Sequence, residues 1–232
     1  MDVQKYRQVM ERIKGRTDYV TSIYRSAESM GKVSVFMVES ICLQLRMAIE
    51  DIAVACIVAN ASEMPAVANR LKKEYRPRHI LKSLEEINPK CYPIPMVENV
   101  SGSTGRFRDT HERPEGDWLT KNDAKSGYGK LSNFVHQNLK YYDGPPIDLN
   151  ATYSFAQELT TKIFNLLSHH HITVLDENKM YRVIMSSSSD GNVQVAEFER
   201  VDDLKVDDII KEFDALSDEP AAKSKGQPRV TN

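Results

Sequence analysis

Hydrophobic positions recur at helical spacing through most of the first 170 residues of the chain. Residues 2–29 follow this period, and we expect one interruption near Gly15. Residues 33–61 are apolar almost all the way around a helical wheel, which is typical of the central helix of a bundle. The pattern therefore predicts two long helices, the second of them largely buried.

Two shorter helices are expected after the central one. Ser62 is placed to cap the first of them, which has Pro65 near its first turn and runs to Tyr75. The second begins at Pro77 and ends at Asn88.

Residues 89–119 lose the helical period and are rich in proline and glycine. We expect an irregular segment here, with a hairpin formed by MVENV and GRFRD. A segment of this length is either a functional flap or disordered. Trp118 is expected to pin its end to the core.

The helical period returns after this segment. Thr120 and Asp123 have the spacing of a capping pair for a helix that contains YGKLSNFVHQNLKYY, and residues 148–168 form another amphipathic helix. The pattern then alternates with a period of two around turns at Glu177–Asn178 and Asp190–Gly191. This alternation predicts short antiparallel strands.

These elements predict a mainly α protein. Residues 1–170 form a helical bundle that carries the irregular flap, and residues 171–216 form a small C-terminal antiparallel β appendage that ends in a short helix. Residues 217–232 have the composition of a disordered tail.

Composition narrows the classes of function. Hydrophobic residues make up 41% of the chain and charged residues 28%, which is typical of a soluble globular protein. A net charge of −2 excludes a global basic field. Three cysteines without metal-binding spacing favour a reducing compartment. Charges inside residues 33–61 oppose membrane insertion, and the N-terminus lacks a signal-peptide core, so we expect a cytoplasmic protein with no membrane contact.

The first candidate site lies within the central helix. Glu39, Arg46 and Glu50 fall within about 40° of one another on a helical wheel, and Gln44 and Asp51 form a second polar stripe on the opposite side. One stripe can face water, and the other must then be buried and paired. The first stripe is either an acid and a guanidinium in a phosphodiester-binding pocket or a structural ion pair.

His136 is the second candidate, in the motif KLSNFVHQNL. Asn133 lies about 60° from it and Ser132 about 40° from it on a helix. An imidazole beside these polar groups suits acid–base chemistry near neutral pH, although a helical histidine is commonly structural.

The third candidate is a basic stretch that surrounds Tyr75 and that suits a nucleic-acid backbone, although a solvated helical surface explains it nearly as well. Its proposed RNA-binding residues are Arg70, Lys72, Lys73, Arg76 and Arg78. The run His169–His171 suggests a metal site, but consecutive histidines do not share one face and no further ligand follows at ligand spacing. We expect neither a metal nor a cofactor.

Three segments carry a resemblance to a known family: LRMAIEDIAVACIVAN, RPRHILKSLEEINPKCYPIP and YGKLSNFVH. Over roughly residues 33–145 the chain resembles uncharacterised bacterial helical proteins and, more distantly, the HEPN (higher eukaryotes and prokaryotes nucleotide-binding) superfamily. Its signature is an arginine four to six residues before a histidine. His136 matches that histidine, but residues 130–132 are Lys, Leu and Ser, so the arginine is absent.

The resemblance implies a HEPN-like bundle, commonly a homodimer, and in many members a metal-independent endoribonuclease of bacterial defence or stress response. Arg46, Glu50, Asn133 and His136 would then form the catalytic site, with Arg46 supplying the missing guanidinium. The alternative is a non-catalytic helical dimer that acts as a protein-interaction module, with an antitoxin-like protein as partner.

Overall fold

The computed structural model describes a mainly helical chain with a small antiparallel sheet toward its C-terminal part, as the sequence pattern predicts. The described residues are 1–100, 107–135, 148–176 and 178–199. The short helix and tail predicted after residue 199 lie outside them. None of the described helices has both the length and the apolar content needed to cross a bilayer.

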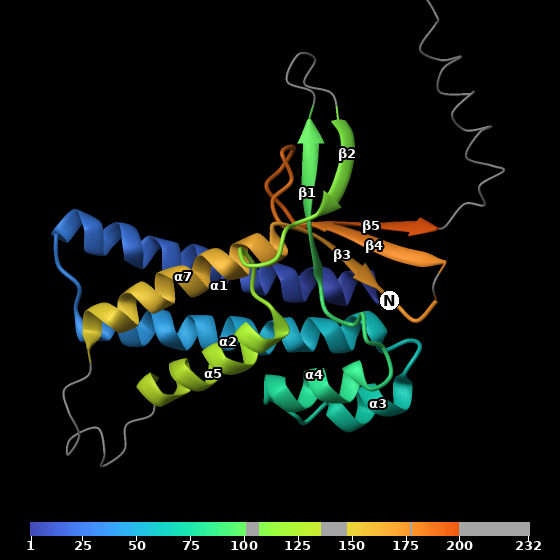
Figure 1. Cartoon of the computed structure of the whole chain (residues 1–232), viewed down its shortest axis with the longest axis horizontal. Helices are drawn as coiled ribbons and strands as arrows, with labels where there is room; N and C mark the ends of the chain where they lie inside the picture. The colour runs from blue at the N-terminus through green and yellow to red at the C-terminus, as the bar shows by residue number, and fades with distance from the viewer. Residues whose placement is uncertain (101–106, 136–147, 177, 200–232) are drawn as a thin grey trace, which may run out of the picture. The chain divides into compact units, whose positions relative to one another are not determined.

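The two long helices predicted at the N-terminus are α1 (Val3–Met30) and α2 (Val35–Asn60), which pack side by side (Figure 1). The interruption expected near Gly15 is wrong, because α1 runs through this residue without a break. A single glycine costs a helix only about 1 kcal/mol, which packing against α2 can offset. The helix ends instead at Gly31, whose φ of 58° is in the left-handed region that glycine favours.

The next two helices, α3 (Pro65–Leu71) and α4 (Pro77–Glu85), both contact α2. Each begins with a proline in its first turn, as expected. The capping role given to Ser62 is wrong, since Met64 occupies the N-cap position without a side-chain hydrogen bond. The helix also ends at Leu71, its last buried residue, rather than at Tyr75.

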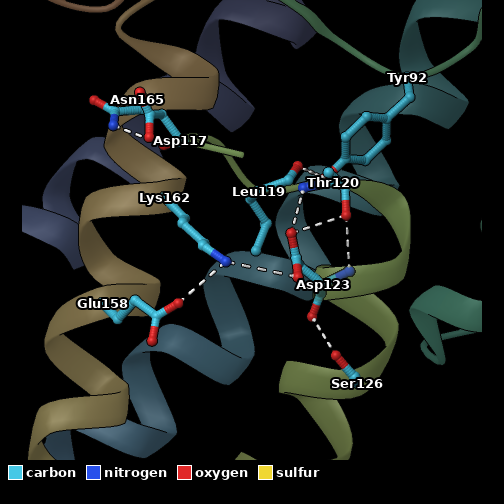
Figure 2. Close-up of polar contacts among 9 residues, drawn as sticks. All are labelled: Tyr92, Asp117, Leu119, Thr120, Asp123, Ser126, Glu158, Lys162 and Asn165. Carbon is cyan, nitrogen blue, oxygen red and sulfur yellow. Dashed lines mark hydrogen bonds and ion pairs between the residues drawn. The ribbon is translucent and has the colours of Figure 1, made fainter. Parts of the chain in front are cut away.

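The helices α5 (Lys121–Val135) and α7 (Leu149–Leu167) complete the described helical part, and both pack on α2. The capping pair predicted for α5 is confirmed. The Asp123 N–H donates to Thr120 Oγ1 at 3.1 Å, and the Thr120 N–H donates to Asp123 Oδ2 at 3.2 Å. Figure 2 shows Lys162 of α7 reaching the same carboxylate, with Nζ 3.8 Å from Oδ1.

The chain that enters α5 is held between the neighbouring elements. Trp118 packs against the core, as predicted. The Leu119 N–H donates to the Lys162 carbonyl at 3.0 Å, and the Tyr92 hydroxyl donates to the Leu119 carbonyl at 3.0 Å (Figure 2). These bonds fix the start of α5 against both α7 and the segment before the sheet.

The sheet contains five strands in the order β2-β1-β3-β4-β5. Its strands are β1 (Ile94–Val100), β2 (Phe107–Glu112), β3 (His169–Thr173), β4 (Lys179–Ile184) and β5 (Gln194–Glu199). The predicted β1–β2 hairpin is confirmed, with Met96 opposite Glu112. It is not a separate flap, because β1 also pairs with β3. Residues Met1–Phe198 consequently form one unit.

Candidate functional site

The predicted Arg46–Glu50 pair is present on α2 and has a third member that the sequence did not indicate. Arg46 Nε lies 3.3 Å from Glu50 Oε1, and Arg46 Nη2 donates to the Tyr128 hydroxyl of α5 at 3.1 Å. The Tyr128 hydroxyl in turn donates to Glu50 Oε1 at 3.0 Å. The Arg46 guanidinium carbon also lies 5.1 Å from the centre of the Tyr128 ring. We call these three side chains the Arg46 triad.

The Arg46 triad is a closed set of charge-assisted contacts. Burial raises the pKa of Tyr128, and the hydrogen bond to Glu50 raises it further, whereas Arg46 lowers it. The phenol therefore stays protonated at neutral pH and can donate to the carboxylate. Glu39, the other member of the predicted stripe, is near Cys42 instead, where burial first and this carboxylate second raise the pKa of the thiol to about 12.

The opposite stripe of α2 is paired with α1. Arg16 Nε donates to Asp51 Oδ2 at 2.8 Å, and Arg16 Nη1 donates to Gln44 Oε1 at 2.8 Å. Arg12 Nε also lies 3.3 Å from Asp51 Oδ2. Asp51 is buried, so the arginines of α1 supply the partners that a buried carboxylate needs. Arg46 and Glu50 of the first stripe and Gln44 and Asp51 of the second are thus paired within the protein.

The described structure does not bring Asn133 to the Arg46 triad. Asn133 is exposed and follows Tyr128 by five residues, which places it about 140° away around α5. It borders a different cavity together with Cys42 and Phe155. His136 lies outside the described residues. Ser132 shares the Tyr128 face, and its buried Oγ has no hydrogen-bond partner within the part of the chain that the structure describes.

The predicted RNA-binding residues all lie exposed on α3, on α4 or between them. Arg76 donates from Nε and Nη2 to Glu74, each at 3.0 Å, and Glu74 also receives the Tyr75 and Arg76 backbone N–H groups. These contacts, led by the Arg76 side chain, lower the pKa of Glu74 to about 2. Tyr75 remains 62% exposed, with the Arg76 guanidinium carbon 6.0 Å from its ring centre.

Glu50 of the Arg46 triad borders a cavity of about 370 Å³ together with Glu74 and Tyr75 of the basic stretch, and we call it the Glu50–Tyr75 cavity. The five basic residues proposed from the sequence to bind RNA do not line it. Its wall includes Lys5 and Arg12 of α1, together with Glu50, Glu74 and Tyr75. Three carboxylates border it, and the arginines at positions 46, 16 and 76 engage one each. The lining itself holds two basic side chains, Lys5 and Arg12, and each of its three carboxylates has an arginine partner.

The three consecutive histidines divide between the two faces of β3, as alternation along a strand requires. His170 is fully buried, with Nδ1 2.9 Å from the Leu167 carbonyl and Nε2 3.0 Å from the Tyr6 hydroxyl. A carbonyl only accepts, so Nδ1 carries the proton and Nε2 accepts from Tyr6. In the described part of the chain no three His, Cys, Asp or Glu residues gather as a metal site.

Tyr128 and Arg16, which pair with the two polar stripes, were not predicted from the sequence. Tyr128 could have been found from the sequence, because it precedes Ser132 by four residues and so shares its helical face. Arg16 is one of several basic residues on α1, and only the packing of α1 on α2 selects it.

Comparisons with protein-family models, with characterised proteins and with solved structures gave no match to this chain. The resemblance to the HEPN superfamily therefore remains a prediction from the residues quoted above.

Proposed function

We propose that this protein binds single-stranded RNA in the Glu50–Tyr75 cavity. The observation that carries the proposal is that Glu50 of α2 and Tyr75 between α3 and α4, which come from two stretches singled out separately in the sequence, border one cavity. An exposed aromatic ring next to basic side chains, here Lys5 and Arg12, is the combination that single-stranded nucleic acids require, since bases stack on the ring and phosphates pair with the cations. The choice of RNA follows the family resemblance.

Each part of the cavity has a distinct role in this proposal. Tyr75 stacks on a base, while Lys5 and Arg12 contact the adjacent phosphates. Arg12 is 61% exposed at its side chain, so it can reach a ligand without leaving a buried position. The Arg46 triad holds the cavity wall and positions Glu50, because each of its members is already engaged by the other two.

Binding is tested by fluorescence anisotropy with a short labelled single-stranded RNA at several salt concentrations. We expect Tyr75→Ala to weaken binding by about 1–3 kcal/mol, since this is the usual contribution of one base–aromatic stack. Lys5→Gln should reduce the salt dependence, because one phosphate contact is lost. Arg25→Gln is the matched control, as Arg25 is an exposed arginine farther along α1. Equal affinities for wild type, Tyr75→Ala and Lys5→Gln would overturn the proposal.

Metal-independent cleavage is the catalytic form of the same proposal. His136 would deprotonate a ribose 2′-hydroxyl, and Arg46 would stabilise the charge that develops on the phosphorus oxygens. Incubation of RNA with the protein in excess chelator tests this form. Cleavage that is lost in His136→Ala supports it. If the RNA stays intact with both wild type and His136→Ala at high concentration, cleavage is ruled out and RNA binding is the remaining function.

A second candidate function is that of a helical dimer with a protein partner, and one surface favours it. Tyr19 of α1 and Phe36 and Leu43 of α2 are 50%, 76% and 43% exposed. Phe36 and Leu43 are seven residues apart and so share a face of α2, and Ser40 between them donates to the Tyr19 hydroxyl at 3.4 Å. Light scattering after size-exclusion chromatography is the test. This function is supported if the wild type is a dimer and the double variant Phe36→Ser, Leu43→Ser is a monomer.

A further inference from the structure

The outer face of the sheet, opposite the face that carries His170, holds a cavity of about 420 Å³ that the proposed RNA site does not use. Residues directly opposite one another on neighbouring strands point to the same face. His169 is opposite Ile184 and His171 is opposite Arg182, so these side chains share the outer face. The cavity lies at the end of this face and is closed by the serine-rich turn that follows β4.

Arg113 gives this cavity a cation that forms no ion pair within residues 1–100, 107–135, 148–176 and 178–199. Its backbone N–H donates to the Pro95 carbonyl at 2.8 Å, which ties it to β1 at the cavity wall. Its Nε is buried and has no hydrogen-bond partner among the described residues. An unsatisfied donor on a buried guanidinium costs free energy, and an oxyanion in the cavity would remove that cost.

A second guanidinium fixes the histidine beside it. Arg182 Nε donates to His169 Nε2 at 2.9 Å, so Nε2 carries no proton, and Nδ1–H faces Glu98 Oε1 at 3.5 Å. Burial first, and Arg182 next, lower the pKa of His169, while Glu98 opposes this shift. The ring is consequently neutral at pH 7, and it holds Arg182 and Glu98 on its two sides.

The cavity is lined by one carboxylate, Glu98, and one guanidinium, Arg113, and the carboxylate already has a partner on β4. Glu98 forms an ion pair with Arg182, so these two cancel. Arg113 then remains, and Glu112, the next carboxylate on this face, is exposed and does not border the cavity. Met96 and Ile184 give the cavity an apolar part, and the hydroxyls of Ser168 and Ser188 give it further hydrogen-bonding groups.

We propose that this cavity binds a small organic oxyanion, with its carboxylate or phosphate on Arg113 and its apolar body against Met96 and Ile184. The volume is within the usual range for small-ligand sites, which are concave and mostly apolar with a few placed polar groups. The two anionic groups share the chemistry that a guanidinium recognises, namely paired oxygens that accept two N–H bonds. The proposal does not depend on RNA binding at the Glu50–Tyr75 cavity.

Calorimetric titration of the full chain with three probes tests the site: benzoate, adenosine monophosphate and inorganic phosphate. We expect binding of benzoate or adenosine monophosphate that exceeds binding of inorganic phosphate, because only the organic probes fill the apolar part. Which of the two binds better identifies the anionic group.

Arg113→Gln should weaken that binding by about tenfold to a hundredfold, the usual range for a hydrogen bond to a charged group. Arg25→Gln should leave it unchanged. Gln194→Trp, which places a large ring at an exposed edge of the cavity, gives an independent block if Arg113→Gln folds poorly. Failure of all three probes to bind, or equal binding by wild type and both cavity variants, would overturn the proposal.

Discussion

Acidification should destabilise this protein through His170. The imidazole is fully buried, and its two nitrogens are satisfied only in the neutral form, by the Leu167 carbonyl and the Tyr6 hydroxyl. Burial, as the main cause, lowers the pKa of His170 from 6.5 to about 4. The folded-state pKa is thus below the unfolded-state value, so the unfolded chain binds more protons between these two pH values.

The magnitude follows from this difference in proton binding. At neutral pH both states are unprotonated and His170 contributes nothing to the pH dependence. As the pH falls from about 7.5 to about 5, the unfolded chain gains a proton that the folded chain excludes, which costs about 2 kcal/mol of unfolding free energy. The loss continues until the pH reaches the folded-state value near 4.

Urea denaturation followed by circular dichroism at closely spaced pH values measures this loss. Tyr6→Phe should lower the unfolding free energy at neutral pH and reduce its loss on acidification, because the hydroxyl that binds only the neutral imidazole is removed. His170→Gln should remove about 2 kcal/mol of the change between pH 7.5 and pH 5, since glutamine does not titrate. Glu74, whose pKa in the folded protein is lowered to about 2, titrates there mostly below the range from pH 7.5 to pH 5. Identical pH dependence in wild type and His170→Gln would refute the reasoning.

Two further predictions concern stability. Asp51→Ala should lower the unfolding free energy by about 3 kcal/mol, because it leaves Arg16, whose side chain is only 13% exposed, without its carboxylate. A loss well under 1 kcal/mol in urea denaturation would show that this ion pair contributes little. Thr120→Ala should cost about 1 kcal/mol by removing one acceptor of the α5 cap. Thermal unfolding checks this value, and Ser126→Ala, inside the same helix, is the control.

The helices could be predicted from the sequence because their signals are local. The apolar wheel of residues 33–61 and the Thr120–Asp123 pair each act within a few turns, and the structure contains both. The errors at Gly15 and Ser62 have one cause. The cost of Gly15 inside a helix and the benefit of Ser62 as a cap are each only about 1 kcal/mol. Packing on α2 outweighs both.

The partners in the candidate sites could be predicted less well, because they depend on contacts distant in sequence. Periodicity located the Arg46 and Asp51 stripes on α2 but did not show that α5 and α1 would pair with them. Spacing along α5 also did not show that the face with Tyr128, rather than the face with Asn133, would meet Arg46. The cavity beside Arg113 could not be predicted at all, because its wall comes from residues far apart along the chain.

The pairing of β1 with β3 has a consequence for the order of folding. Ile94 pairs with His171, more than seventy residues later in the chain, so the sheet cannot be completed until the whole helical part has been synthesised. Until then, the β1–β2 hairpin has an open edge that can pair with another chain. A ribosome-bound or truncated chain ending at α7 should therefore aggregate through β1, and a peptide with the sequence of β3 should suppress this association.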